Sequence, residues 1–315
     1  MLWRLISTRL ALAALTLLLV SVIIFVGIEV LPGDVASRVL GREATASQKA
    51  IFREQMHLDR PLYERYLIWV SNALRGDFGR ALTSDREVVD IVAPKLRNTL
   101  LLATFSFLLY IPLTLIFAII SAVKRNSFMD NLISGMTIVG LSTPEFLLAT
   151  VLLLLFAVKI PVLPTISALE KAKTLGDFVR FMTLPAITLA IVTSVYAIRM
   201  LRDNLIEVLD ADYIKMAQLK GLSIWQVTWR HAVPNALLPT LNVTALNLAY
   251  LIGGVVIVER VFVFPGMGNH LVNAIQLLDV PVIEAIVLII SAIYILSNLV
   301  ADVAGILLTP RLRTG

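Results

Sequence analysis

The amino-acid sequence predicts an all-α integral membrane protein with six transmembrane helices. Hydrophobic residues make up 58% of its 315 residues and charged residues only 16%, whereas a soluble domain carries about 25% charged residues. This deficit of charge indicates that much of the surface faces lipid. Six apolar segments also reach or approach the roughly 20 residues that a helix needs to cross the hydrocarbon core. These segments are 10–31, 98–123, 132–158, 184–200, 236–258 and 282–307.

The first apolar segment, within residues 1–31, is too long for the core of a signal peptide and ends without an A-x-A cleavage site. We therefore expect it to remain as the first transmembrane helix. Residues 32–97 are too polar to span a membrane, and we expect a small extracytoplasmic loop region with a turn at residues 76–79. Residues 98–307 then hold the other five helices, and residues 308–315 form a cytosolic tail.

Positive charges predict the orientation of these helices, because short cytoplasmic loops carry an excess of Lys and Arg. With the N-terminus inside, the short inside segments hold 11 Lys and Arg residues and the short outside segments hold 5. We therefore expect both termini to be cytoplasmic. The inside segments are 1–9, 124–131, 199–235 and 308–315, and the outside segments are 159–183 and 259–281.

The composition argues against several kinds of site. The chain has no cysteine, so disulfides, thiol catalysis and Cys-ligated metals are excluded. His57, His231 and His270 are far apart in the sequence and form no H-E-x-x-H zinc motif. The net charge of +5 comes from Lys and Arg between apolar segments, not from a basic stripe with interleaved aromatics. We therefore expect a lipid bilayer around the chain, and neither a nucleic-acid partner nor a cofactor within it.

Residues 211–234, between the fourth and fifth apolar segments, carry the most informative local pattern. They predict a short helix over about 211–220, ended by Gly221, which can adopt a left-handed backbone. Ser223 and Gln226, three residues later, predict a capping box at the start of a second short helix. Pro234 then interrupts the pattern.

Two functions fit a short cytosolic helix at this place. Tyr213, Ala217 and Gly221 are four residues apart and lie along one face, and the small residues Ala217 and Gly221 would let another protein surface approach the backbone. The helix could then transmit force from a soluble partner into the membrane. The alternative is an amphipathic helix that lies on the lipid surface, and periodicity alone does not decide between the two.

The same loop resembles the EAA motif of ABC importer permeases, in which A-x3-G is followed by nine residues and then I-x-L-P. Ala217 and Gly221 match best. The departures are Lys215 at the acidic position, Met216 at the first alanine, His231 for isoleucine and Val233 for leucine. The resemblance implies that an ATPase docks on this loop, and the candidate coupling residues are Tyr213, Lys215, Ala217, Gly221, Ser223 and Pro234.

Further fragments resemble the dipeptide/oligopeptide/nickel branch of this family, in the same order and at matching spacing. They are LPGD at 31–34, LDRPLYERYLIW at 58–69, LRGDFGRAL at 74–82, GLSTPEF at 140–146, VERVFVFPGMGNHLVNAI at 258–275 and TPR at 309–311. The long first loop suggests the first of the two permease subunits that such systems encode. Each fragment is weak alone, but together they are specific to the branch.

The resemblance implies a type I ABC importer permease fold in the inner membrane of a bacterial or archaeal cell. The chain would form half of a translocation pathway with a second homologous permease subunit, and an extracytoplasmic binding protein would deliver the solute. No glycine precedes a lysine, so the chain has no P-loop, and two separate ABC ATPase subunits would bind ATP and Mg. The chain is then a transport subunit and not an enzyme. Di- or oligopeptides are the expected solutes, with nickel or another small solute as the alternative.

Polar residues inside apolar segments are candidates for lining the pathway. Glu145 follows Pro144 in the third segment, where it could face the pathway. Asn298 and Asp302 are four residues apart and share a face of the sixth segment. The simpler interpretation of Asn298 and Asp302 is an interhelical hydrogen-bonded pair.

A second candidate region follows the fifth segment, on the outside. Pro265, Gly266 and Gly268 predict a tight turn. The family resemblance implies a loop near the extracytoplasmic gate, and a simple connector is the alternative. His270, beside this turn, is expected to be a surface residue and not a metal ligand.

Two other classes of membrane protein fit the sequence less well. An ion-coupled secondary transporter favours internal repeats and buried carboxylates at mid-membrane, but no repeat is evident and most acidic residues are near helix ends. An intramembrane hydrolase could use Ser142, but no histidine lies within an apolar segment to pair with it. Neither class explains the pattern at 211–234.

Overall fold

The part of the chain that the structure describes is predominantly helical. The computed structural model describes residues 2–29, 45–55, 59–253 and 255–308, and the fragments predicted at 31–34 and 309–311 lie outside these ranges. Within them the backbone forms helices, turns and a single isolated β-bridge between Arg80 and Glu87. The predicted all-α class is confirmed.

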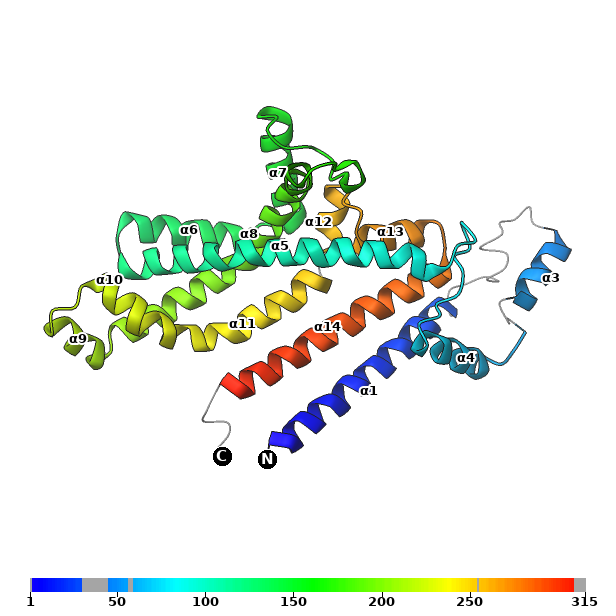
Figure 1. Cartoon of the computed structure of the whole chain (residues 1–315), viewed down its shortest axis with the longest axis horizontal. Coiled ribbons are helices and arrows are strands. Elements are labelled where there is room, and N and C mark those ends of the chain that lie inside the picture. The colour runs from blue at the N-terminus through cyan, green and yellow to red at the C-terminus, as the bar shows by residue number, and fades with distance from the viewer. Residues whose placement is uncertain (1, 30–44, 56–58, 254, 309–315) are drawn as a thin grey trace.

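Figure 1 shows how the helices follow one another along the chain. The first part contains α1 (Leu2–Glu29), α3 (Ala46–Gln55), α4 (Leu62–Leu74), α5 (Val88–Val123), α6 (Phe128–Ser142), α7 (Glu145–Leu153) and a π-helical turn, η1 (Leu154–Lys159). The second part contains η2 (Leu169–Lys171), α8 (Leu175–Leu209), α9 (Asp212–Leu219), α10 (Ile224–Val227), η3 (Thr228–Ala232), α11 (Val233–Gly253), α12 (Val256–Val261), α13 (Met267–Gln276) and α14 (Val280–Leu308).

Four helices in the described part of the chain are long and apolar enough to cross a membrane, or five if a bent pair counts as one span. The four cover Ile6–Ile28, Val88–Val123, Leu175–Leu209 and Val280–Val300. They correspond to the first, second, fourth and sixth predicted segments, and the fourth is much longer than predicted. Residues 236–258 divide between α11 and α12, so the number six stays a prediction.

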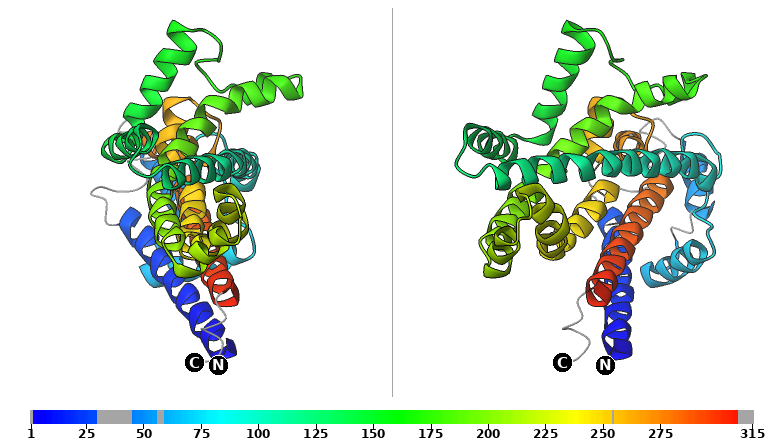
Figure 2. Two further views of the ribbon diagram at one scale, coloured as in Figure 1. Left: turned by 90° about the vertical axis from the view of Figure 1, so that its left-hand side faces the viewer. Right: turned by 60° about the vertical axis from the view of Figure 1, so that its left-hand side comes forward.

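The third predicted segment, 132–158, is not one straight helix. It breaks between α6 and α7, and the two parts differ in direction by 111° (Figure 2). Pro144 explains the break, because a proline disfavours helical backbone at the preceding residue, and Thr143 is indeed extended at φ −92°, ψ 121°. Glu145 therefore lies in the first turn of α7, whereas the sequence had suggested a position within one continuous span.

The centre of the fold is the packing of α5 against α8, which run side by side in the same direction (Figure 1). Small side chains recur at helical spacing on the buried face of each helix, and small residues let helix backbones approach closely in a membrane. On α5 these are Ala103, Ser106, Ala118 and Ala122, and on α8 they are Ala186, Ala190 and Ala197. α6 and α11 pack on α8, and α14 joins α11 to α1.

The described part of the first loop packs on the first helix. The Tyr66 hydroxyl lies 2.8 Å from Ser21 Oγ, and the Phe25 ring packs edge-to-face against Tyr66 and at a tilt against Trp69. The predicted turn is present, with the left-handed φ values +82° at Gly76 and +73° at Gly79. The loop is therefore held against α1 at the end of the molecule that carries α3, α4 and α13 (Figure 1).

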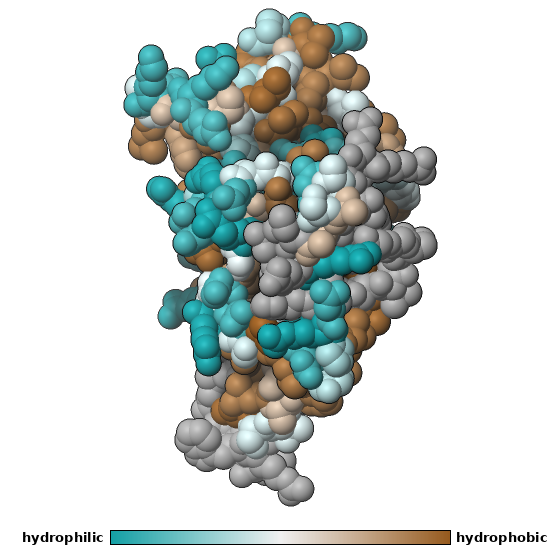
Figure 3. Space-filling view, turned by 90° about the vertical axis from the view of Figure 1, so that its right-hand side faces the viewer, coloured by the Kyte–Doolittle hydropathy of each residue, from teal (hydrophilic) through white to brown (hydrophobic). Residues whose placement is uncertain are grey.

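The two ends of the helical core differ in what they carry. The first turn of α1, the last turns of α14 and the short helices α9 and α10 lie toward one end, and α4 and α13 lie toward the other (Figure 1). Viewed from the α4 and α13 end, the surface mixes hydrophilic areas with apolar patches (Figure 3). This arrangement is the one that the predicted topology requires, with the loop after α1 and the loop between α8 and α11 on opposite sides.

Candidate functional site

The loop at 211–234 begins with a short helix, α9, and a glycine turn. The helix that follows, α10, continues through η3 into α11, so the chain stays helical at Pro234, where the sequence predicted an interruption. α9 covers Asp212–Leu219, and Gly221 adopts the left-handed φ of +90° that ends it. The Ser223 hydroxyl then accepts a hydrogen bond from the Gln226 N–H (3.3 Å), and the Gln226 side chain accepts one from the Ser223 N–H (2.9 Å). The predicted helix end and capping box are both confirmed.

Two buried residues anchor this loop to the rest of the fold. Ile214 of α9 and Val227 of α10 are completely buried, so the loop is held in place rather than hanging free. On the other side of the loop large apolar side chains are exposed, and such a patch marks a contact with a protein or with lipid. These side chains are Tyr213, Met216, Leu219, Ile224, Trp225 and Trp229.

The other candidate coupling residues lie on the same loop as these apolar side chains. Gly221 is exposed, and an added Cβ there would meet nothing within 4 Å, so the chain itself leaves the space beside it open. Ala217 is half-buried, and its carbonyl accepts a 3.4 Å hydrogen bond from the Leu222 N–H. Lys215 pairs with Asp212 in an exposed ion pair at 3.1 Å. Pro234 is exposed in the first turn of α11.

One tyrosine of α11, Tyr250, contacts Glu145 and shares a cavity with Asn298. The Tyr250 hydroxyl donates a 2.5 Å hydrogen bond to Glu145 Oε2. Tyr250 also lines a cavity of about 620 Å³ between α1, α11 and α14, and Asn298 and Tyr294 line the same cavity. Asp302 lies within α14, and its side chain is outside the described part of the structure. The predicted Asn298–Asp302 pair therefore stays a prediction.

Sequence reasoning missed a row of polar residues on α11 that faces α5 and α8. Asn247 donates to the Thr193 carbonyl (3.0 Å), and the Thr244 hydroxyl lies 3.0 Å from the Tyr110 hydroxyl. Thr240 accepts from the Asn204 side chain at 3.3 Å. The spacing of Thr240, Thr244 and Asn247 along a helix was the available signal. These contacts join three helices by polar groups in the middle of the bundle.

The turn with Pro265, Gly266 and Gly268 is built around a buried carboxylate that the sequence did not single out. Glu259 of α12 is completely buried. It accepts hydrogen bonds from the Thr99 hydroxyl of α5 (2.7 Å) and from the Asn269 N–H in the first turn of α13 (2.9 Å). Glu259 therefore holds the start of α13 against α5.

The two glycines of this turn are required by space. A Cβ at Gly266 would lie 2.0 Å from Glu259 Oε1, and one at Gly268 would lie 2.6 Å from the Val256 Cα. Glu259 lies outside the segments that qualify as spans, and its burial raises the pKa of its carboxyl to about 7. The turn is thus a close-packed element and not a loose connector.

His270 lies one turn further along α13, in a cavity of about 410 Å³ near Lys95 and Asp279. Burial, together with the charge of Lys95, lowers the pKa of its imidazole. No group of three or more His, Asp or Glu side chains among the described residues is placed to hold a metal ion. His270 is half-buried, whereas the sequence had suggested a residue at the surface.

Comparison with known proteins decides the family. Residues 99–314 match the family described as "Binding-protein-dependent transport system inner membrane component", and residues 1–103 match its N-terminal counterpart. The chain belongs to this family. It is an ABC importer permease of the dipeptide/oligopeptide/nickel type, as the sequence motifs predicted.

Individual relatives support the same assignment along the whole chain. The permease is 36% identical over 298 residues to the "Glutathione transport system permease protein GsiC" of Escherichia coli (strain K12), and the match covers 95% of each chain. The proteins of the same name from Shigella dysenteriae serotype 1 and Shigella flexneri serotype 5b match with the same identity and coverage.

Family membership settles the class of protein. The permease is a multi-pass inner-membrane transport subunit of a bacterial system and not an enzyme. The secondary transporter and the intramembrane hydrolase are therefore set aside.

Proposed function

We propose that this permease forms half of the pathway of an ATP-driven importer for di- or oligopeptides, paired with a second homologous permease subunit. An extracytoplasmic binding protein delivers the solute, and two ABC ATPase subunits bind ATP and Mg on the cytosolic side. Residues 1–31 hold the first helix, 32–97 the extracytoplasmic loop region, 98–307 the permease core and 308–315 the tail.

The observation that carries this proposal is the preformed loop of α9 and α10. Its capped helices, its open space beside Gly221 and its exposed Trp225 form a surface that the chain does not cover itself. A helix that merely lies on lipid needs no left-handed turn of this kind. The loop also connects α8 directly to α11, so a displacement of α9 reaches both helices.

The mechanism follows from this connection. ATP binding closes the ATPase pair, which pulls on residues 211–234, and α8 and α11 move with the loop. The polar contacts between Tyr110, Thr244 and Asn247 tie α11 to α5, so the movement opens the pathway toward the outside. Hydrolysis then resets the permease. Glu145 and Asn298 are proposed to line this pathway, and Pro265, Gly266 and Gly268 to border its outer gate.

A peptide solute is favoured by the relatives, since glutathione is a small peptide with free carboxylates and an amine. The test is uptake by proteoliposomes that contain the permease with the partner subunits and binding protein encoded beside it. We expect ATP-dependent uptake of labelled dipeptide or tripeptide that unlabelled peptide suppresses and nickel does not. Suppression by nickel alone would contradict the peptide assignment, and uptake without ATP would contradict the importer mechanism.

A further inference from the structure

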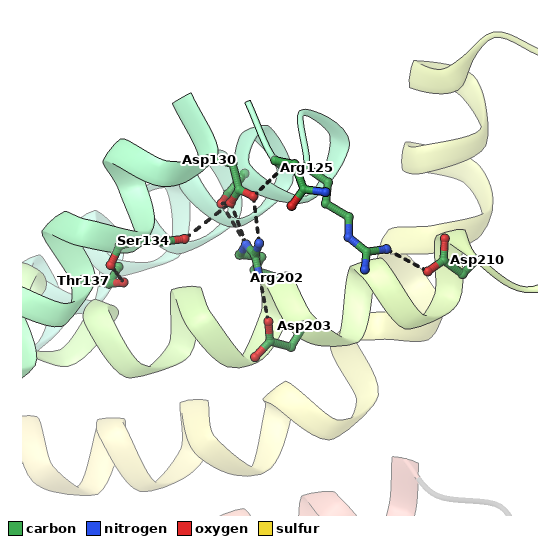
Figure 4. Close-up of polar contacts among 9 residues, drawn as sticks. Arg125, Asp130, Ser134, Thr137, Arg202, Asp203 and Asp210 are labelled. Carbon is green, nitrogen blue, oxygen red and sulfur yellow. Dashed lines mark hydrogen bonds and ion pairs between the residues drawn. The ribbon is translucent and has the colours of Figure 1, made fainter. Parts of the chain in front are cut away.

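A buried ion pair lies beside the loop of α9 and α10, and neither family motif nor pathway accounts for it. Asp130, at the start of α6, has a side chain that is only 2% exposed. Arg202 of α8 binds it through two parallel hydrogen bonds, from Nε to Oδ1 (2.7 Å) and from Nη2 to Oδ2 (2.8 Å), as Figure 4 shows. A bidentate pair of this kind fixes the relative direction of both side chains.

The same carboxylate also binds the end of α5 and the turn that follows it. Asp130 accepts hydrogen bonds from the Ser121 hydroxyl of α5 and from the Asn126 N–H (2.9 Å). One carboxylate thus connects α5, the turn, α6 and α8. Arg202 is about two turns from the end of α8, so the connection is roughly 10 Å from the start of the loop.

A second pair connects the same turn to the end of α8. Arg125 binds Asp210, the residue that caps α8, at 2.9 Å (Figure 4). Both side chains are largely exposed, and an exposed pair of this kind contributes little. The buried pair is different, because removing one partner leaves an uncompensated charge inside the protein. Of these two ion pairs, the one between Asp130 and Arg202 is therefore the rigid connection.

We propose that the Asp130–Arg202 pair is the joint that makes the end of α5 and the start of α6 move with α8 during transport. Buried apolar side chains such as Ala122, Ile133 and Leu201 also hold α5, α6 and α8 together at this end, and the pair adds a fixed direction and register to that packing. Asp130 and Arg202 are then positioning residues, which act through the helices and touch no solute. This inference rests on the proposed coupling role of the loop at 211–234.

The first test uses the double variant Asp130→Asn/Arg202→Met in the reconstituted importer. The asparagine Oδ1 can still accept from the Asn126 N–H while its amide donates to the Ser121 hydroxyl, so the links to α5 and to the turn remain. The variant removes the buried charges on both sides, and among the described residues the only charge it leaves without its partner is that of Asp203, which is 67% exposed. We expect the assembled complex to hydrolyse ATP within about twofold of wild type and its uptake to fall by roughly tenfold. The control, Arg125→Met, should keep both activities within about twofold.

Two results would contradict the proposal that the Asp130–Arg202 pair acts as this joint. Wild-type uptake by the double variant would show that the pair transmits nothing. Loss of the ATPase subunits together with uptake would show that the pair only holds the fold. Failure of the proposed function itself is separate, because wild-type permease would then show no ATP-dependent uptake.

A second test asks whether α6 and α8 move as one body. An ideal Cβ at Gly140 of α6 lies 3.7 Å from the Cβ of Val195 of α8, which suits a disulfide, and the chain has no cysteine of its own. We expect the oxidised Gly140→Cys/Val195→Cys permease to transport at a rate within about twofold of that of its reduced form. A disulfide that impaired coupling even moderately would lower the rate by more than about twofold. If oxidation abolishes uptake and dithiothreitol restores it, α6 and α8 slide past each other and the joint is wrong.

Discussion

Substitution of Gly268 by alanine tests the interpretation of the outer turn as a close-packed element. The added Cβ would lie 2.6 Å from the Val256 Cα and 2.8 Å from its Cγ2, whereas carbon atoms pack at about 3.5–4.0 Å. Since a Cα cannot rotate away, the start of α13 must move by about 1 Å. The hydrogen bond from the Met267 N–H to Thr99 Oγ1, now 2.9 Å, would then stretch beyond the usual range.

Overpacking of this kind costs about 1–3 kcal/mol. We therefore expect the melting temperature of detergent-purified Gly268→Ala permease to fall by several degrees, with less uptake but normal co-purification of the ATPase subunits, because the turn is at the other end of the molecule. The matched control is Gly135→Ala in α6, where a Cβ meets nothing within 4 Å and alanine favours the helix. Equal melting temperatures for the two variants would refute the reasoning.

Three further predictions test the orientation, the pathway and the buried carboxylate. In intact cells, Gln218→Cys should resist a membrane-impermeant thiol reagent and Ser84→Cys should react; labelling at 218 would reverse the topology. Glu145→Gln should alter peptide uptake, and Tyr250→Phe should act similarly because it removes the 2.5 Å hydrogen bond; normal uptake with normal expression would remove Glu145 from the pathway. The raised pKa of Glu259 means that the folded state holds a proton between about pH 4.5 and pH 7, so stability should fall as the pH rises through this window. Glu259→Gln should abolish that dependence, and an unchanged pH profile would contradict the assignment.

The loop of α9 and α10 was predictable because its signals are local. A glycine that ends a helix and a serine with a glutamine three residues later act through their own backbone neighbours. Gly221, Ser223 and Gln226 adopt the conformations that the sequence predicted. The exposed aromatic residues Trp225 and Trp229 could not be recognised as exposed, because exposure depends on how the loop packs on α8 and α11.

The buried carboxylates were missed because their partners are distant in the sequence. Asp130 binds Arg202, and Glu259 binds Thr99 of a helix more than a hundred residues earlier. Nothing in the neighbourhood of either acid indicates these partners. The signal for Glu259 was indirect: Gly266 and Gly268 were noted as turn residues, although the structure requires them because Glu259 and Val256 leave no room for a side chain.

The break after α6 shows a third limit of sequence reasoning. Pro144 was visible, but hydropathy treats residues 132–158 as one apolar segment, and a proline inside such a segment can give a mild kink or a complete break. The extended backbone at Thr143 shows that the helix breaks completely and is not merely kinked. Glu145 consequently lies in the first turn of a new helix, α7, and accepts a hydrogen bond from Tyr250 of α11.

The most direct test of the central claim is whether the α9–α10 loop couples the permease to its ATPase. Gly221→Asp places a side chain on a left-handed backbone, which costs about 1 kcal/mol or more, and puts a charge into the proposed contact. We expect the variant to insert normally but to lose ATP-driven uptake, together with the ATPase subunits or their coupling, and Ala217→Asp to behave alike. Gln218→Asp, exposed on the same helix, should be milder. If Gly221→Asp retains both uptake and ATPase co-purification at wild-type levels, the loop is not the coupling element.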